Sequence, residues 1–399
     1  MSDKHLSSKV ASMAESETLA MAQKARELKS KGIDVIALSL GEPDFDTPDY
    51  IKEAAKKALD EGYTKYPPVS GYPELRKAIQ HKFKRDNKLD YDLSEIVVSN
   101  GAKQCIANTC LALLDPNDEV IIFTPYWVSY FHIVEFAGGK PVPLYAGIDQ
   151  DFKVSAQQLE EAISERTKLI IYSSPSNPTG SVYTPDEIEA LANVISKHPR
   201  LYVIADEIYE YINFEGNCPS IASFPGMKEK TITVNGMSKG FAMTGWRLGY
   251  MAAPKWIADA CAKVQGQFTS GANAFGQIAA AEALMQDPAK QDYMKEKYLE
   301  RKHLVKSMLD DIDGIQANDP TGAFYFFPDI SQIFGRSNGK RTIDNADEFI
   351  DVLLEEAHVA AVSGKAFGDP NCFRLSYATS NALLTEALTR MKKVLDTYR

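Results

Sequence analysis

Leu201-Tyr-Val-Ile-Ala205 is an apolar run that ends in an acid, Asp206. Its residues are apolar on both faces of a strand, which is typical of a parallel sheet covered by helices on both sides. A similar run, Lys168-Leu-Ile-Ile-Tyr172, precedes it, with a segment of helical periodicity between the two. This alternation predicts an α/β domain with a mostly parallel sheet.

The same alternation extends over residues 94–253, and we expect all of its apolar runs to be interior strands. The four further runs are Ile96–Ser99, Val120–Phe123, Thr231–Val234 and Leu248–Met251. After Asp287 the pattern changes to a long charged helix, residues 288–311, followed by short strands and two more helices. These features predict a second, smaller α+β unit.

The predicted division places an N-terminal arm and part of the smaller unit in residues 1–46. The large domain covers residues 47–287, and residues 288–399 complete the smaller unit. The helix Glu17–Ser30 and the run Val35–Leu40 are expected to join the C-terminal unit in space.

The composition excludes several classes of function. The chain has 399 residues and a net charge of −10, without a basic block that could follow a nucleic acid backbone. Its five cysteines are scattered and form no CxxC pair, so neither a disulfide framework nor a metal site is predicted. No leader-like or membrane-spanning apolar segment is seen, and a cytoplasmic protein is expected.

Ligands of open parallel sheets bind beyond the carboxyl ends of the strands, so the residues that follow each strand are the first candidates for a site. Gly101 and Ala102 begin a helix whose N–H groups could bind a phosphate, or they form a plain turn. Asn177 lies in a turn with two prolines. Asp206 ends an apolar run three residues before Tyr209, and it is either a carboxylate of the site or a helix cap. Lys239 is either an imine-forming amine or a surface lysine.

The co-occurrence of these elements in one order, with Arg247 eight residues after the lysine, resembles the class I aminotransferases. These are fold-type I enzymes that depend on pyridoxal phosphate. The stretches Thr64-Lys-Tyr-Pro-Pro68, Pro125-Tyr-Trp-Val-Ser-Tyr130 and Ala242-Met-Thr-Gly-Trp-Arg247 are most similar to bacterial-type aspartate aminotransferases. The resemblance extends from Gly41 to Tyr377 and implies a mostly parallel, seven-stranded sheet with helices on both faces.

The resemblance implies a role for each matching residue. Lys239 would form the imine with the cofactor and carry the proton, and Asp206 would hold the protonated ring nitrogen. The residues implied to bind the cofactor are Gly101, Ala102, Lys103, Trp127, Asn177, Asp206, Tyr209, Ser238, Lys239, Arg247 and, from a partner subunit, Tyr66. A site completed across an interface implies a homodimer.

The implied substrates are amino acids and 2-oxo acids. Arg374 would pair with the α-carboxylate, bordered by Gly41, Trp127 and Asn177. Lys103, helped by Ser16 and Thr18, would bind a distal carboxylate, which predicts transamination between L-aspartate and 2-oxoglutarate.

Three alternatives stay open at this point. The first is a broader aromatic or prephenate aminotransferase, and the second is a pyridoxal phosphate-dependent β-lyase. The third is a non-catalytic regulator, which would usually carry an added DNA-binding segment. One departure from the pattern concerns Gly236, where many relatives have a serine that contacts the phosphate.

Overall fold

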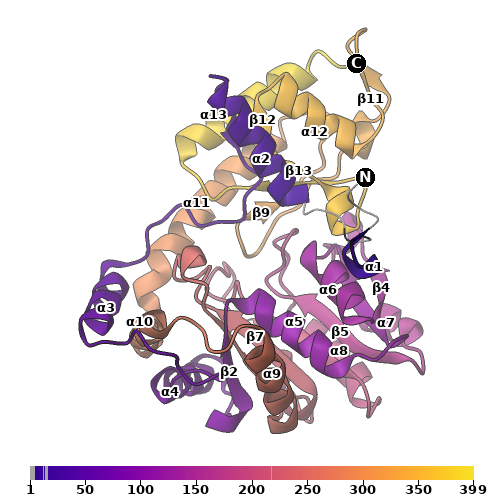
Figure 1. Cartoon of the computed structure of the whole chain (residues 1–399). Helices are drawn as coiled ribbons and strands as arrows, with labels where there is room; N and C mark the ends of the chain where they lie inside the picture. Colours follow the sequence, from indigo (N-terminus) through magenta and orange to yellow (C-terminus); the bar gives the residue numbers. More distant parts are fainter. Residues whose placement is uncertain (1–4, 12, 14–16, 217) are drawn as a thin grey trace.

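A central sheet of seven strands forms the base of the molecule (Figure 1). The computed structural model describes residues 5–11, 13, 17–216 and 218–399. The strand order is β2 (Ile96–Ser99), β8 (Gly249–Ala252), β7 (Thr231–Gly236), β6 (Tyr202–Asp206), β5 (Thr167–Ser173), β3 (Glu119–Thr124) and β4 (Lys140–Tyr145). Only β8 runs against its neighbours in this sheet. The predicted α/β fold with a mostly parallel seven-stranded sheet is confirmed.

The expectation that all six runs are interior strands was wrong for β2, which lies at one edge of the sheet. All four of its residues are nevertheless buried. The helices α4 (Pro73–Lys82), α5 (Ala102–Leu113) and α9 (Lys255–Phe268) pack against it, and the N–H of Val98 donates to the carbonyl of Ser70 at 3.1 Å. An edge strand covered in this way has the same apolar pattern as an interior one.

The other edge strand, β4, is the seventh strand of the sheet and matches none of the six predicted runs. It contains Pro141 and Pro143 and is only partly buried. The N–H groups of Lys140 and Ala146 donate inward to β3 and the residues flanking it, so the alternation of the strand turns the nitrogens of both prolines outward. Proline is tolerated on that side, because an edge strand needs no donor there.

Helix ends differ in a way that bears on ligand binding. In α8 (Pro185–Ser196) the Thr184 hydroxyl accepts the N–H of Glu187, whose carboxylate in turn accepts the N–H of Thr184. This reciprocal cap satisfies two of the free donors at the start of the helix. The start of α5 has no side-chain cap, since Gly101 precedes it with φ 88°. The first N–H groups of α5 are therefore left for another partner.

A second group of elements joins the two ends of the chain. The strands β1 (Ile36–Ala37) and β12 (Val359–Ala360) pair in parallel, and β13 (Val362–Ser363), β14 (Phe373–Ser376) and β9 (Tyr325–Phe326) form an antiparallel sheet. One hydrophobic core contains residues of α2 (Glu17–Ser30), α11 (Asp292–Leu309), α12 (Ala346–Glu355) and α13 (Asn381–Leu395). Figure 1 shows α2, α12 and α13 together beyond the large sheet. The domain boundaries at residues 46 and 287 stay a prediction.

The remaining helices surround these sheets. They are α1 (Ser8–Ala11), α3 (Asp49–Asp60), α6 (Ser129–Ala137), α7 (Ala156–Ala162) and α10 (Ala274–Met285), and a two-stranded ladder is formed by β10 (Arg336–Ser337) and β11 (Thr342–Ile343). In the described part of the chain, no helix has both the length and the apolar character needed to cross a membrane. Within those residues no three potential metal-binding side chains come together.

Candidate active site

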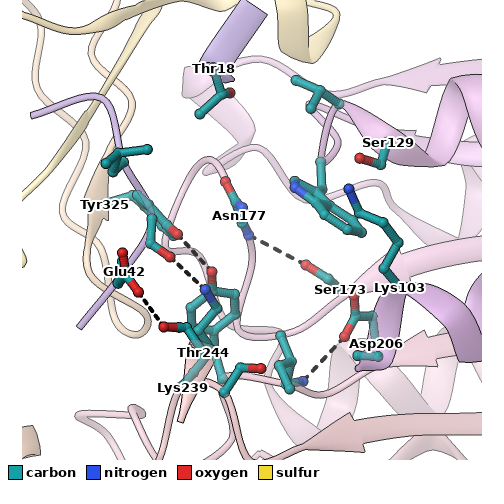
Figure 2. A pocket seen from close by; sticks show the side chains of 18 of the residues that line it. Thr18, Glu42, Lys103, Ser129, Ser173, Asn177, Asp206, Lys239, Thr244 and Tyr325 are labelled. Carbon is teal, nitrogen blue, oxygen red and sulfur yellow. Dashed lines mark hydrogen bonds between the residues drawn. The ribbon is translucent and has the colours of Figure 1, made fainter. Parts of the chain in front are cut away.

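A cavity of about 350 Å³ lies beyond the carboxyl ends of the parallel strands, where the N-terminal segment and β9 and β14 approach the large sheet (Figure 2). Many of its lining residues lie at or just after the carboxyl ends of strands β2, β3, β5, β6 and β7, as expected for an open parallel sheet. The predicted residues that line it are Thr18, Gly41, Ala102, Lys103, Trp127, Asn177, Asp206, Tyr209, Ser238, Lys239, Arg247 and Arg374.

Two of the described residues that were predicted for the site are not found in this wall. Tyr66 is 95% exposed and does not line the cavity of its own chain. Gly101 lies just behind the lining, and Ser16 falls outside the described residues. The cavity formed by one chain therefore contains most, but not all, of the predicted set.

The start of α5 and Arg247 form one corner of the cavity. The N–H of Gly101 donates to the carbonyl of Ser99 at 2.8 Å, so the prediction that this N–H is free to bind a phosphate needs correction. The N–H groups of Ala102 and Lys103 have no partner among the residues described. Gly101 serves another purpose, because a Cβ there would collide with the guanidinium of Arg247.

The structure explains why position 236 is a glycine and not a serine. It faces Gly249 across the β7–β8 pair, and a Cβ at position 236 would lie 2.9 Å from both the Gly249 Cα and the Leu248 carbonyl oxygen. A serine would therefore push the two strands apart. The hydroxyl groups of Ser129 and Ser238 are among those that line the cavity and could supply a contact to an anion, whereas the hydroxyl of Thr244 donates to Glu42.

Asp206, the last residue of β6, presents a buried carboxylate to the cavity. It accepts the hydroxyl of Tyr130 at 2.6 Å and the N–H of Ile208 at 3.3 Å. Burial raises the pKa of Asp206 to about 6, and the two hydrogen bonds act in the opposite direction. A positively charged group bound beside it would favour the ionised carboxylate.

Lys239 extends into the cavity from the loop after β7. Its Nζ donates to the carbonyl oxygen of Gly41 at 2.5 Å and lies 5.8 Å from the centre of the Tyr209 ring. Removal from water lowers the pKa of Lys239 to about 8, and the positive charge of Arg374 acts in the same direction. A larger share of the amine is therefore neutral and nucleophilic than at an exposed lysine.

Arg374, only 2% exposed, comes from β14. Its Nη2 donates to the carbonyl oxygen of Ser39 at 2.7 Å, and its Nη1 donates to Oδ1 of Asn177 at 2.8 Å. The guanidinium lies between the rings of Tyr325 and Phe367, each 4.7 Å away. Because the amide oxygen of Asn177 is occupied, its NH2 group is the end that can serve a ligand.

Lys103 and Trp127 lie side by side in the wall of the cavity. The Lys103 ammonium is 4.8 Å from the centre of the Trp127 ring. Partial burial and the nearby charge of Arg247 lower the pKa of Lys103. Such a cation is held in place by an aromatic face while its charge remains available.

The cavity has an excess of positive charge. Its lining contains four cationic side chains, Lys103, Lys239, Arg247 and Arg374, against two carboxylates, Glu42 and Asp206. None of the four cations lies within salt-bridge distance of a carboxylate in the described parts of the chain. Their partners are backbone carbonyls, an amide oxygen and aromatic faces. This arrangement favours a ligand with several negative charges.

Two tyrosines of the site were not predicted from the sequence. Tyr130 holds Asp206, and Tyr325 shares a hydrogen bond of 2.7 Å with Tyr209. Tyr130 ends the stretch that begins at Pro125 and resembles the family, and this resemblance could have indicated it. Tyr325 had no local signal, because it reaches the site through the pairing of β9 with β14.

Known proteins share both the sequence and the fold of this chain. Residues 33–391 match the family model described as aminotransferase class I and II. Over its whole length the chain is 46% identical to a bifunctional aspartate aminotransferase and glutamate/aspartate-prephenate aminotransferase of Petunia hybrida, covering 84% of that protein. Among solved structures, an aspartate aminotransferase from Rhizobium meliloti is 42% identical, with a TM-score of 0.96 and 99% and 100% of the two chains covered. An aspartate aminotransferase from Thermus thermophilus with maleate is also 42% identical, with a TM-score of 0.92 and 98% and 99% covered.

We predict that the cofactor-free protein captures pyridoxal phosphate faster as the pH rises through about 8. The neutral amine of Lys239 is the nucleophile, and its share grows until the pH exceeds this pKa. Stopped-flow absorbance after mixing measures the rate constant. Lys239→Arg is the control and should show no covalent capture. A rate constant that stays flat between roughly pH 6.5 and 9.5 would contradict the assignment.

Proposed function

Because this chain belongs to the class I and II aminotransferases, whose class I members use pyridoxal phosphate, we propose that it transfers the amino group of L-aspartate to 2-oxoglutarate. The products are oxaloacetate and L-glutamate. One observation carries this proposal. Four cationic side chains line the cavity, and none of them has a carboxylate partner among the described residues. A cofactor phosphate and a dicarboxylic substrate together supply the missing negative charge.

The residues of the cavity fit pyridoxal phosphate. The phosphate is assigned to Arg247, Ser238 and the N–H groups of Ala102 and Lys103, since the uncapped start of α5 favours an anion. Trp127 would supply an aromatic face for the ring, and Asp206 would hold the ring nitrogen. Asn177 and Tyr209 provide donors for the ring oxygen O3′.

The reaction requires that a proton leave the substrate Cα. The bound cofactor supplies an electron-withdrawing ring that stabilises the negative charge at that carbon. The neutral Nζ of Lys239 accepts the Cα proton as general base. Arg374 binds the α-carboxylate through a bidentate ion pair. This contact orients the substrate and so determines which Cα bond lies nearest to Lys239. Asp206 keeps a proton on the ring nitrogen by placing a negative charge beside it.

Selectivity for a dicarboxylic acid is assigned to Lys103, assisted by Thr18 of α2. The ammonium is held over Trp127 and has no carboxylate partner among the described side chains. The Thermus thermophilus relative named with maleate, a dicarboxylate, supports this choice. Ser16, the second hydroxyl predicted for this role, lies outside the described residues and is given no contact.

A second candidate substrate is prephenate or an aromatic acid. A mostly apolar groove of about 590 Å³ shares Lys103, Val128 and Ser129 with the cavity and is lined also by Leu111, Ile133 and Phe136. A ring could lie there while Lys103 binds its carboxylate. The Petunia hybrida relative is named for both aspartate and prephenate.

We further propose a homodimer that works in the cytoplasm. Tyr66 is 95% exposed and away from the cavity of its own chain, which suits a residue that serves the partner's site. All five cysteines are free thiols, and four of them are buried, which suits a reducing compartment.

The half-reaction tests the function. We expect that aspartate alone converts the bound aldehyde of the cofactor to its amine form and yields one equivalent of oxaloacetate. Absorbance follows the cofactor, and mass spectrometry identifies the product. Release of pyruvate and ammonia in repeated turnovers from an amino acid with a leaving group on Cβ, such as cystathionine, would instead indicate the β-lyase alternative. Absence of any spectral change with aspartate or glutamate would refute the proposed transamination.

For Lys103→Ala we predict a fall in kcat/KM for aspartate of roughly 100-fold, because a bound carboxylate loses its cation. The values for alanine and phenylalanine should change only a few-fold. Single-turnover kinetics with the three amino acids measure this difference. Lys263→Ala, which removes an exposed lysine from α9, is the matched control. Equal losses for all three substrates would rule out a role in side-chain selection.

Tyr66→Phe should weaken cofactor binding by about 10- to 100-fold, since it removes one hydrogen bond to a charged phosphate. Mixing this variant with Lys239→Ala, at a cofactor concentration below the Kd of the former, distinguishes the two possible locations. If Tyr66 serves the partner, random reassociation restores about a quarter of the wild-type sites. If it serves its own chain, mixing restores no activity.

A further inference from the structure

Tyr325 connects two residues that have separate tasks in the proposed site. It lies in β9, is fully buried and lines the cavity. Its ring packs against the guanidinium of Arg374, and its hydroxyl is 2.7 Å from that of Tyr209. Tyr325 and Arg374 come from neighbouring antiparallel strands, whereas Tyr209 follows strand β6 of the large sheet.

We propose that Tyr325 is a positioning residue that donates its hydroxyl hydrogen to Tyr209 and thereby directs the hydroxyl hydrogen of Tyr209 toward the cofactor oxygen O3′. This inference rests on the proposed function, because it assumes that pyridoxal phosphate occupies the cavity.

The direction of the hydrogen bond follows from counting hydrogens. Each phenol hydroxyl has one hydrogen and can also accept. Neither tyrosine hydroxyl has another partner in the parts of the chain that are described. The adjacent Arg374 charge makes Tyr325 the better donor of the pair, because a cation favours loss of a phenol proton. Tyr209 then keeps its hydrogen for a ligand acceptor.

The backbone of Gly41 leaves room for this contact. A Cβ built at position 41 would overlap the hydroxyl oxygen of Tyr325. Any side chain there would therefore displace Tyr325 from Tyr209. The same glycine carbonyl accepts Lys239, so the segment that holds the amine also sets the position of the tyrosine pair.

The resulting chain of contacts runs from Arg374 through Tyr325 to Tyr209. Its first member is assigned to the substrate α-carboxylate and its last to the cofactor O3′. When a carboxylate neutralises Arg374, the donor strength of Tyr325 changes, and the hydrogen bond at O3′ changes with it. Substrate binding and cofactor protonation are coupled by this route.

Tyr325→Phe tests the proposal, since it keeps the ring and removes only the hydroxyl. A donor to O3′ stabilises its anionic form, so a weaker or misdirected donor raises the pH at which the bound chromophore loses its proton. We expect this apparent pKa to rise by about half a unit to one unit, with a five- to tenfold loss of kcat/KM for aspartate. A pH titration of the visible absorbance of the loaded enzyme measures the first quantity.

Two further variants make the test specific. Tyr298→Phe removes the hydroxyl of another buried tyrosine of the same core, one that has no partner among the described residues, and should titrate like the wild type. Gly41→Ala, which leaves Tyr325 chemically intact but displaces it, should raise the pKa as Tyr325→Phe does. Thermal unfolding midpoints confirm that each variant is folded.

A titration of Tyr325→Phe that coincides with that of the wild type would overturn the proposal. So would an equal shift in Tyr298→Phe, because the effect would then be a general loss of packing. If the wild-type chain takes up no cofactor, the proposed function fails and this inference fails with it. That outcome is distinguishable from failure of this inference alone, in which the wild type shows the cofactor spectrum and Tyr325→Phe titrates at the same pH.

Discussion

Uncompensated positive charge is the constraint around which the site is built. Removing a guanidinium or ammonium from water is costly unless partners replace the lost hydration. Arg374 receives two oxygen acceptors and two aromatic faces, yet its Nε has no partner within the described residues. The chain as a whole has a net charge of −10, so the cavity is a local positive exception. Anions are drawn to it and complete its stabilisation.

The cations and the groups that hold them come from segments that are far apart in the sequence. Arg374 comes from a C-terminal strand, Lys239 from the loop after β7, and the acceptor carbonyls of Ser39 and Gly41 from the N-terminal segment. Asp206 sits at the end of a strand with neighbours on both sides. Groups placed on paired strands keep their positions better than groups on free loops. The geometry for a multiply charged ligand therefore exists before that ligand arrives.

The sequence could predict what depends on local pattern. Strands β5 and β6 have long apolar runs, and Asp206 and Lys239 stand out chemically against the residues that precede them. The edge position of β2 was not predictable, because helices bury it as fully as an interior strand. The occupied N–H of Gly101 depends on turn geometry, and Tyr325 depends on a strand pairing between distant segments. Patterns of single segments contain no information about such contacts.

The outward prolines of β4 also matter before the protein has finished folding. A sheet edge with free N–H groups can recruit a strand from another chain and start aggregation. Pro141 and Pro143 have no hydrogen to offer on that side of the edge. A newly made chain that exposes this edge at high concentration therefore gives a neighbouring molecule few donors to pair with.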